Sequence, residues 1–301
     1  MTECTMDPKQ KIAFVFSPQL GDSLLSMVVI NNLYKNGYDV EVFSNYIFEL
    51  HRWFSWTTIH PYPSQENIKS QLSAYDTLIF LYEHDIMGDA NLWHPNIIVL
   101  SKLTPPDKTK GHIIETLMEV CRKPLNLNNI TSNNGLVPPQ GLLRYKYPRR
   151  IIIHPTSREE FRSWPKHKFL ELANRLQKLG YETSFIVSPK ERPQWKNEIT
   201  RSSRAPKFSS LDELAAYLYE SAWFIGNDSG IGHLASNLGL STITLAVRPG
   251  LARLWRPYWS DGVVILPPAW LITRQLKEKF WKHCISVDRV FKVFTSTTIP
   301  S

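Results

Sequence analysis

The sequence predicts a chain of two doubly wound α/β halves, and three observations support this fold class. Short apolar runs of strand length alternate with segments whose apolar side chains follow helical spacing, both early and late in the chain. The chain has 301 residues, a length that suits two domains of ordinary size. A segment at 125–150, rich first in asparagine and proline and then in basic residues, separates the two alternating regions. We therefore predict domains at 1–145 and 146–301.

The first half opens with a continuous apolar run at 11–16, of the kind that parallel sheets bury. Gly21 and Asp22 follow, and a helical pattern then continues until Gly37. Residues 39–43 have the character of a second strand, which completes a strand–helix–strand unit. The further elements predicted in this half are strands at 78–82 and 96–100 and a helix at 113–120.

The second half repeats the alternation. Pro165 favours the first turn of a helix, where proline costs least, and Gly180 ends that helix. Ser210 and Glu213 have the spacing of a capping box, so another helix is expected after them. The remaining elements predicted here are strands at 150–154, 183–187, 222–226 and 242–247 and helices at 230–238 and 286–294.

Residues 227–235, with the sequence Asn-Asp-Ser-Gly-Ile-Gly-His-Leu-Ala, turn the chain from a predicted strand into a predicted helix. The first amides of a helix have no intrahelical partner, and the helix dipole places partial positive charge beside them, so an anion is favoured there. Ser229 adds a hydroxyl, and Gly230 lets a ligand approach the backbone. The stretch predicts a diphosphate site, while the alternative interpretation is that Asp228 or Ser229 only caps the helix.

Other candidate residues follow predicted strands, at the edge where ligands bind in such sheets. Asp22 can act there as a general base, or it can be only the N-cap of a helix. Thr156 and Ser157 offer hydroxyls and amides to a phosphate. Arg162 can place a positive charge against that phosphate, or it can be an ordinary solvated residue. Glu191 stands where an acidic residue can take a ribose hydroxyl.

The net charge of +8 and the pI near 9.3 favour acidic partners such as nucleic acid, anionic lipid or phosphorylated sugars. No RNA-binding signature or zinc-finger spacing is present, which disfavours nucleic acid. Arg248, Arg253 and Arg256 follow a predicted strand, and they either gather an anionic substrate or form a solvated basic edge.

Three cysteines without a close pair suit a reducing cytosol, and no apolar run approaches the ~20 residues that a membrane span needs. We expect a cytoplasmic protein that meets a membrane only at its cytoplasmic surface. Metal-ligand types occur between 84 and 94, namely His84, Asp85, Asp89 and His94, but their spacing fits no familiar site. We therefore expect neither a metal nor a cofactor.

Three separated motifs together resemble glycosyltransferase family 9, whose best-known members are the ADP-heptose:lipopolysaccharide heptosyltransferases. They are Gly21-Asp22, the run at 154–176 and the stretch at 227–239, in the family's order and separation. The resemblance implies the GT-B fold, two Rossmann-like domains facing a central cleft, with the acceptor on the first and the nucleotide sugar on the second. It also implies metal-independent, inverting transfer of a sugar, with heptose from ADP-heptose favoured, to a lipopolysaccharide core acceptor at the bacterial inner membrane.

Under this resemblance Asp22 corresponds to the catalytic base, and Arg162 stands where the family has a lysine that neutralises the departing diphosphate. The residues that it assigns to the nucleotide sugar are Thr156, Ser157, Glu191, Asp228, Ser229, Gly230, Ile231 and His233. Three positions depart from the family pattern, namely Asn227 in place of glycine, Arg162 in place of lysine, and Arg248 in a segment where many members have Phe-Gly-Pro. The sugar, the nucleotide base, the acceptor and the oligomeric state stay open.

Two alternative functions remain at this point. One is a nucleotide-sugar epimerase or hydrolase on the same fold, which would change the donor without any acceptor. The other is a non-catalytic module that binds an anionic glycolipid through its basic surface, with strong salt dependence and no response to nucleotide.

Overall fold

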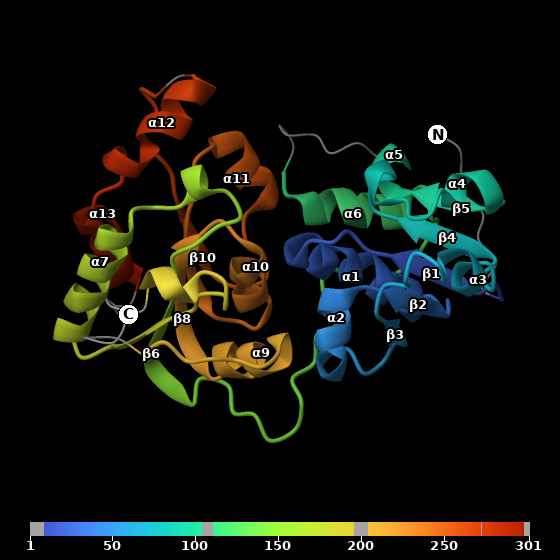
Figure 1. The fold of residues 1–301 in the computed structure, drawn as a ribbon, viewed down its shortest axis with the longest axis horizontal. Coiled ribbons are helices and arrows are strands. Elements are labelled where there is room, and N and C mark those ends of the chain that lie inside the picture. Colours follow the sequence, from blue (N-terminus) through green and yellow to red (C-terminus); the bar gives the residue numbers. More distant parts are fainter. Residues whose placement is uncertain (1–8, 104–110, 196–203, 272, 298–301) are drawn as a thin grey trace. The chain divides into compact units, whose positions relative to one another are not determined.

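The structure is a computed structural model that describes residues 9–103, 111–195, 204–271 and 273–297. The chain divides into two compact units, Met1–Gln140 and Gly141–Ser301, and each is built on its own five-stranded parallel sheet (Figure 1). We call them the first and the second unit. The division falls inside the segment between the two alternating regions, a few residues before the position proposed from the sequence.

The first unit has the strand order β3-β2-β1-β4-β5. Its strands are β1 (Ile12–Val15), β2 (Val40–Phe43), β3 (Ile59–His60), β4 (Thr77–Phe80) and β5 (Ile97–Val99). Its helices are α1 (Leu20–Lys35), α2 (Asn45–Glu49), η1 (His51–Trp53), α3 (Ile68–Leu72), η2 (Glu83–Asp85), α4 (Ala90–Trp93), α5 (Leu100–Leu103) and α6 (Ile113–Arg122). All four residues of β1 and of β4 are buried, and α1 is buried along most of its length, as expected for a helix that is apolar nearly all round.

The second unit has the strand order β10-β9-β8-β6-β7. Its strands are β6 (Tyr147–His154), β7 (Glu182–Phe185), β8 (Ser221–Asn227), β9 (Ser241–Leu245) and β10 (Gly262–Ile265). Its helices are η3 (Glu160–Arg162), α7 (Lys166–Lys178), α9 (Leu211–Tyr219), α10 (Gly230–Asn237), α11 (Pro249–Trp255), α12 (Arg274–Cys284) and α13 (Val287–Thr297). The buried side chains of Trp164 and Trp281 belong to a core that also includes apolar residues of the strands and of α7 and α13.

Each sheet has one point at which its winding direction reverses. In the first unit the chain moves outward from β1 through β2 and β3, and it then returns to the other side of β1 with β4 and β5. In the second unit the reversal lies between β6 and β8. Ligands of doubly wound sheets bind outside the carboxyl ends of the strands at this reversal. The segments after β1 and β4, and those after β6 and β8, are therefore the places to look for a site.

The predicted fold class, two doubly wound α/β halves, is confirmed, and the structure adds elements that the sequence did not reveal. Strand β3 has only two residues, too few for any periodicity to show. Strand β10 and helix α12 were also not predicted, since β10 is short and half-exposed and α12 is mostly polar. Helix α1 begins at Leu20, two residues before Asp22, where the helical pattern of the sequence begins.

Candidate active site

Asp22 lies in the first turn of α1, directly beyond the carboxyl end of β1. The Ser17 hydroxyl donates to its Oδ2 atom at 3.4 Å. Burial, with a smaller contribution from the Asp85 carboxylate, raises the pKa of Asp22 to about 6, although Ser17 and His84 act in the opposite direction. A carboxyl with this pKa is ionised at neutral pH yet holds a proton more firmly than an ordinary aspartate, as a general base must.

The alternative interpretation of Asp22 as a helix N-cap is wrong. The N-cap position of α1 is occupied by Gln19, which makes no side-chain capping bond, and Asp22 is the third residue of the helix itself. Its carboxyl therefore does not cap the helix, and it remains available at the reversal point of the sheet to accept a proton.

Asp85 ends η2, which follows β4, and its carboxyl lies near that of Asp22 because β4 pairs with β1. The side chain is only 1% exposed, and the Tyr82 amide donates to its Oδ2 at 3.2 Å. Burial raises the pKa of Asp85 as well. Sequence reasoning considered Asp85 only as a metal-ligand type. Asp85 follows β4, the strand that pairs with β1, and this position is what brings it close to Asp22. The proximity could have been predicted only if the strand order were known.

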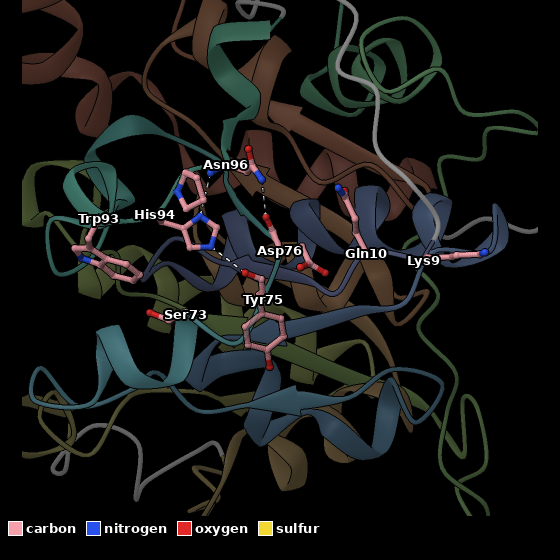
Figure 2. Close-up of a pocket in the computed structure, with 9 residues that line it drawn as sticks. Lys9, Gln10, Ser73, Tyr75, Asp76, Trp93, His94 and Asn96 are labelled. Carbon is pink, nitrogen blue, oxygen red and sulfur yellow. Dashed lines mark hydrogen bonds between the residues drawn. The ribbon is translucent and has the colours of Figure 1, made fainter.

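The other residues of metal-ligand type do not form a site. In the described part of the chain no group of three or more His, Cys, Asp or Glu side chains could hold a metal ion. His94 lines a pocket of about 420 Å³. Figure 2 shows it there beside Tyr75 and Asn96. The ring accepts from the Asn96 amide at 3.3 Å, and its other nitrogen lies 3.0 Å from the Tyr75 carbonyl oxygen. This pocket adjoins the amino ends of β1, β4 and β5, the edge opposite Asp22.

Asn227, which the sequence left unexplained, joins three segments at the reversal point of the second sheet. Its side chain is fully buried at the end of β8. The Nδ2 atom donates to the Pro155 carbonyl at 2.7 Å, and the Oδ1 atom accepts from the Trp164 amide at 3.0 Å. The amide thus connects β8 to the loop after β6 and to the start of α7, a connection that a glycine could not make.

Ser229 is the N-cap of α10, and its hydroxyl accepts from the Gly232 amide at 3.3 Å. The capping interpretation is therefore correct for Ser229. It does not exclude the anion site, because the amides of Gly230 and Ile231 are the first two of the helix and have no acceptor within it. The cap orients the turn, and the helix dipole favours an anion beside these two amides.

Arg162 and Asp228 form an ion pair, in which Nη2 of the arginine donates to Oδ2 of the aspartate at 2.5 Å. Arg162 ends η3 and Asp228 follows β8, so the pair joins the two segments of the reversal point. The side chains are 30% and 23% exposed, so a ligand can reach both. A diphosphate at the α10 turn would have to share Arg162 with Asp228 or take it over.

Thr156 and Glu191 are brought together on the β7 side of the same region. The Ser188 amide donates to Glu191 Oε2 at 2.9 Å. Burial acts to raise the pKa of Glu191, but hydrogen bonds from Ser188 and Thr156 outweigh it, so the pKa is lowered and the carboxyl stays ionised. Ser157 is placed differently, because its hydroxyl donates to the Glu159 carbonyl at 2.7 Å and lies 3.1 Å from Ser163 Oγ.

His233 is buried in α10, and burial lowers its pKa, so the ring is neutral at physiological pH. Its ring makes a hydrogen bond to the backbone of Trp255, whereas its Nδ1 atom has no hydrogen-bond partner among the described residues. Arg248 Nε lies 3.9 Å from Glu278 Oε1, and that carboxylate also pairs with Arg274 at 2.9 Å. The charge of Arg248 is therefore partly countered within its own unit.

The sequence profile of glycosyltransferase family 9 (heptosyltransferase) matches residues 104–266, more than half of the chain. The chain belongs to this family. Lipopolysaccharide heptosyltransferase 3 of Escherichia coli is 26% identical over 172 residues, which are 51% of this chain and 49% of that relative. The similar region thus spans about half the length of the relative.

Two solved structures support the same assignment at the level of fold. The glycosyltransferase family 9 protein of Veillonella parvula matches with a TM-score of 0.75 and 16% identity over 98% of both chains. An E. coli heptosyltransferase solved with ADP-2-deoxy-2-fluoro heptose matches with a TM-score of 0.68 and 14% identity, over 96% of this chain and 100% of that one. These likenesses confirm the GT-B type of α/β fold for this family 9 member. Among the described helices, none combines the length and the apolar character of a bilayer-spanning segment.

Proposed function

We propose that this family 9 protein is an inverting glycosyltransferase that moves heptose from ADP-heptose to a lipopolysaccharide core acceptor, without a metal ion and with Asp22 as the general base. The observation that carries the proposal is the complementary chemistry of the two reversal points. One holds a carboxylate with raised proton affinity, and the other holds amides, hydroxyls and an arginine suited to a diphosphate. Family membership and the ADP-heptose analogue bound by a structural relative support the donor class.

The second unit is assigned to the donor. The amides of Gly230 and Ile231 and the Ser229 hydroxyl face the diphosphate, and Arg162 adds a positive charge that the diphosphate shares with Asp228 or takes over from it. As the anomeric bond breaks, negative charge grows on the leaving nucleoside diphosphate, and prearranged donors stabilise that charge strongly in a partly desolvated site. This is the positive charge that a metal ion supplies in other glycosyltransferases. The ionised Glu191 takes a ribose hydroxyl, with Thr156 beside it.

The first unit is assigned to the acceptor. Asp22 removes the proton from the acceptor hydroxyl as its oxygen bonds to the anomeric carbon and the bond from that carbon to the diphosphate breaks. A single displacement of this kind inverts the anomeric configuration. No covalent sugar–enzyme intermediate is involved, so one carboxylate is sufficient.

The acceptor is proposed to reach the enzyme at the cytoplasmic face of the inner membrane. Helix α12 supports this placement, because it exposes Leu276 and Phe280 one helical turn apart and carries Arg274, Lys277 and Lys279. Basic helices with exposed apolar side chains bind anionic lipid surfaces, and the net charge of +8 acts in the same direction.

The first test is a thermal-shift titration with ADP, UDP, GDP and CDP in the presence of a chelator. A ligand that binds only the folded state raises the unfolding midpoint, so a selective shift with ADP is expected. ADP-heptose and a lipid A–Kdo acceptor then test transfer. A shift with another nucleotide would change the donor but not the mechanism, and no shift with any of them would contradict the donor site.

The two alternative functions give different results in the same assays. An epimerase or hydrolase would convert ADP-heptose when no acceptor is present, which product analysis detects. A glycolipid-binding module would bind acceptor vesicles in a salt-sensitive way and show no nucleotide-dependent shift.

A further inference from the structure

Four side chains lie next to one another at the reversal point of the first sheet, namely Asp22, Ser17, Asp85 and His84, and the last of them is exposed to solvent. Ser17, which is 2% exposed, donates its hydroxyl to Asp22 at 3.4 Å. The same hydroxyl lies close enough to the Asp85 carboxyl to lower the pKa of that group. Asp85 Oδ1 lies 3.7 Å from Nε2 of His84. The exposure of the side chains changes abruptly between the last two, from 1% for Asp85 to 77% for His84.

A hydroxyl that lies between two carboxyl groups can donate to only one of them at a time, because it has a single hydrogen. When both carboxyls are ionised, Ser17 can satisfy one of them and leaves the other without its hydrogen. When Asp22 is protonated, Ser17 can accept from Asp22 and donate to Asp85 at the same time. The arrangement is therefore most completely hydrogen-bonded when the two carboxyls together hold one proton.

From this geometry we propose that Asp85 is a positioning residue that acts through Asp22: it receives, through the Ser17 hydroxyl, the proton that Asp22 takes from the acceptor, and His84 releases that proton to solvent. The proposal rests on the assignment of Asp22 as the base. It adds a route by which the base is reset after each turnover.

The proton balance of the relay closes. Asp22 gains one proton from the acceptor hydroxyl. It passes that proton to Ser17 Oγ while the original Ser17 hydrogen moves to Asp85, so Ser17 ends as a neutral hydroxyl. Asp85 transfers its proton to His84, and the imidazolium loses it to water. Asp22 and Asp85 are again ionised, and no oxidant, reductant or other reactant is required.

The other titratable groups that face these four side chains do not replace them. Burial raises the pKa of the phenols of Tyr62 and Tyr82, which therefore stay neutral. The Tyr62 hydroxyl is directed elsewhere, since it donates to the Phe16 carbonyl at 2.8 Å. The charge of Glu83, beside His84, is paired with Lys102 at 2.6 Å. His84 is thus the exposed group that is both close to Asp85 and able to take up and release a proton.

The decisive experiment measures the titration of Asp22 directly in the whole protein, by NMR of isotopically labelled aspartate carboxyls. The Asp22 signal is the one that disappears in Asp22→Asn. We expect Asp85→Asn to lower its midpoint, on the order of one pH unit, because a neighbouring negative charge is lost. Ser17→Ala should raise the midpoint instead, because a hydrogen bond to the ionised form is lost. Asp89→Asn, an equal charge change at an exposed position after the same strand, should leave it unmoved.

Opposite shifts in the two variants support the relay, whereas a midpoint that stays unmoved in both overturns it. The measurement needs no substrate, so it is independent of the donor and acceptor assignments. If Asp85→Asn does not fold, Ser17→Ala alone decides through the upward shift.

Turnover of ADP-heptose with the lipid A–Kdo acceptor tests the exit of the proton. His84→Gln should reduce kcat several-fold, and added imidazole should restore it, because a small base can replace the lost ring. A loss that imidazole does not restore, or no loss at all, overturns the route through His84. Transfer that persists in Asp22→Asn would instead contradict the proposed base, so failure of the relay and failure of the function are distinguishable.

Discussion

The reversal points of the two sheets contain different chemistry in similar architecture. In the first unit, two carboxyls and two phenols gather, and burial raises the pKa of each of these groups. In the second unit, Arg162 pairs with Asp228, and hydrogen bonds lower the pKa of Glu191. The first place favours holding a proton and the second favours holding an anion. The fold supplies the position, and a few side chains after each strand decide what the position can do.

The two sheets also differ in strand order. The first unit has the order found in dinucleotide-binding folds, and the second, counted within the unit, has the order 2-1-3-4-5 found in flavodoxin-like folds. Both orders produce one reversal next to the first strand of the unit. Equivalent positions therefore arise from two different windings, and the comparison can be tested with single substitutions on each side.

The largest expected effect is on catalysis in the first unit. Asp22→Asn removes the base while retaining size and polarity, so transfer should fall about a thousandfold with ADP affinity unchanged. Asp89→Asn is the matched control and should retain activity. Transfer assays with ADP-heptose and a nucleotide titration check both expectations, and retained turnover would contradict the role of Asp22.

Asp22→Asn should lower activity but increase the free energy of unfolding. The pKa of Asp22 is about 6 in the folded protein against 3.8 ordinarily, so ionisation of this group costs the fold up to about 3 kcal/mol above pH 6. Asp22→Asn should therefore be more stable than the wild type at pH 8, and the difference should disappear as the pH falls from 6 to below 4. Urea unfolding across this range measures it. A difference that does not depend on pH would show that folding does not raise the pKa of Asp22.

In the second unit, Arg162→Ala should weaken ADP binding by about 2 kcal/mol, roughly thirtyfold, because a charge-assisted hydrogen bond to the diphosphate is lost. Arg162→Lys should have a smaller effect, since it keeps the charge but not the planar donor geometry. Arg158→Ala, exposed in the same loop, is the control. Calorimetric titration that shows equal affinity for Arg162→Ala and Arg158→Ala would remove Arg162 from the site.

The last expected effect, of similar size, concerns the stability of the second unit. Asn227→Ala leaves the Pro155 carbonyl and the Trp164 amide without partners in a buried place, which should cost about 2 kcal/mol of unfolding free energy. Gln275→Ala, on the exposed side of α12, should change it little. Denaturant unfolding compares the two variants. An unchanged midpoint for Asn227→Ala would mean that water hydrogen-bonds the Pro155 carbonyl and the Trp164 amide in place of the lost side chain.

The local features of the fold and of the candidate site could be predicted from the sequence. The apolar runs gave the buried strands, and the motifs placed Asp22 after β1 and Ser229 at the start of α10. The contacts between distant residues could not be predicted. Arg162 and Asp228 are separated by 66 positions, and Asn227 and Trp164 by 63. Such pairs depend on which strands are neighbours, and neither local propensity nor residue spacing determines that order.

The Asn227 amide has a mechanical consequence for the loop between β6 and α7. It fastens this loop at Pro155 on one side and at Trp164 on the other. Thr156, Ser157 and Arg162 belong to the intervening residues, 156–163. All three side chains therefore lie on a short loop whose two ends are hydrogen-bonded to the same side chain, Asn227. The sequence and conformation of the loop can vary between its fixed ends. The distance over which Arg162 can move is nevertheless limited by the length of the loop.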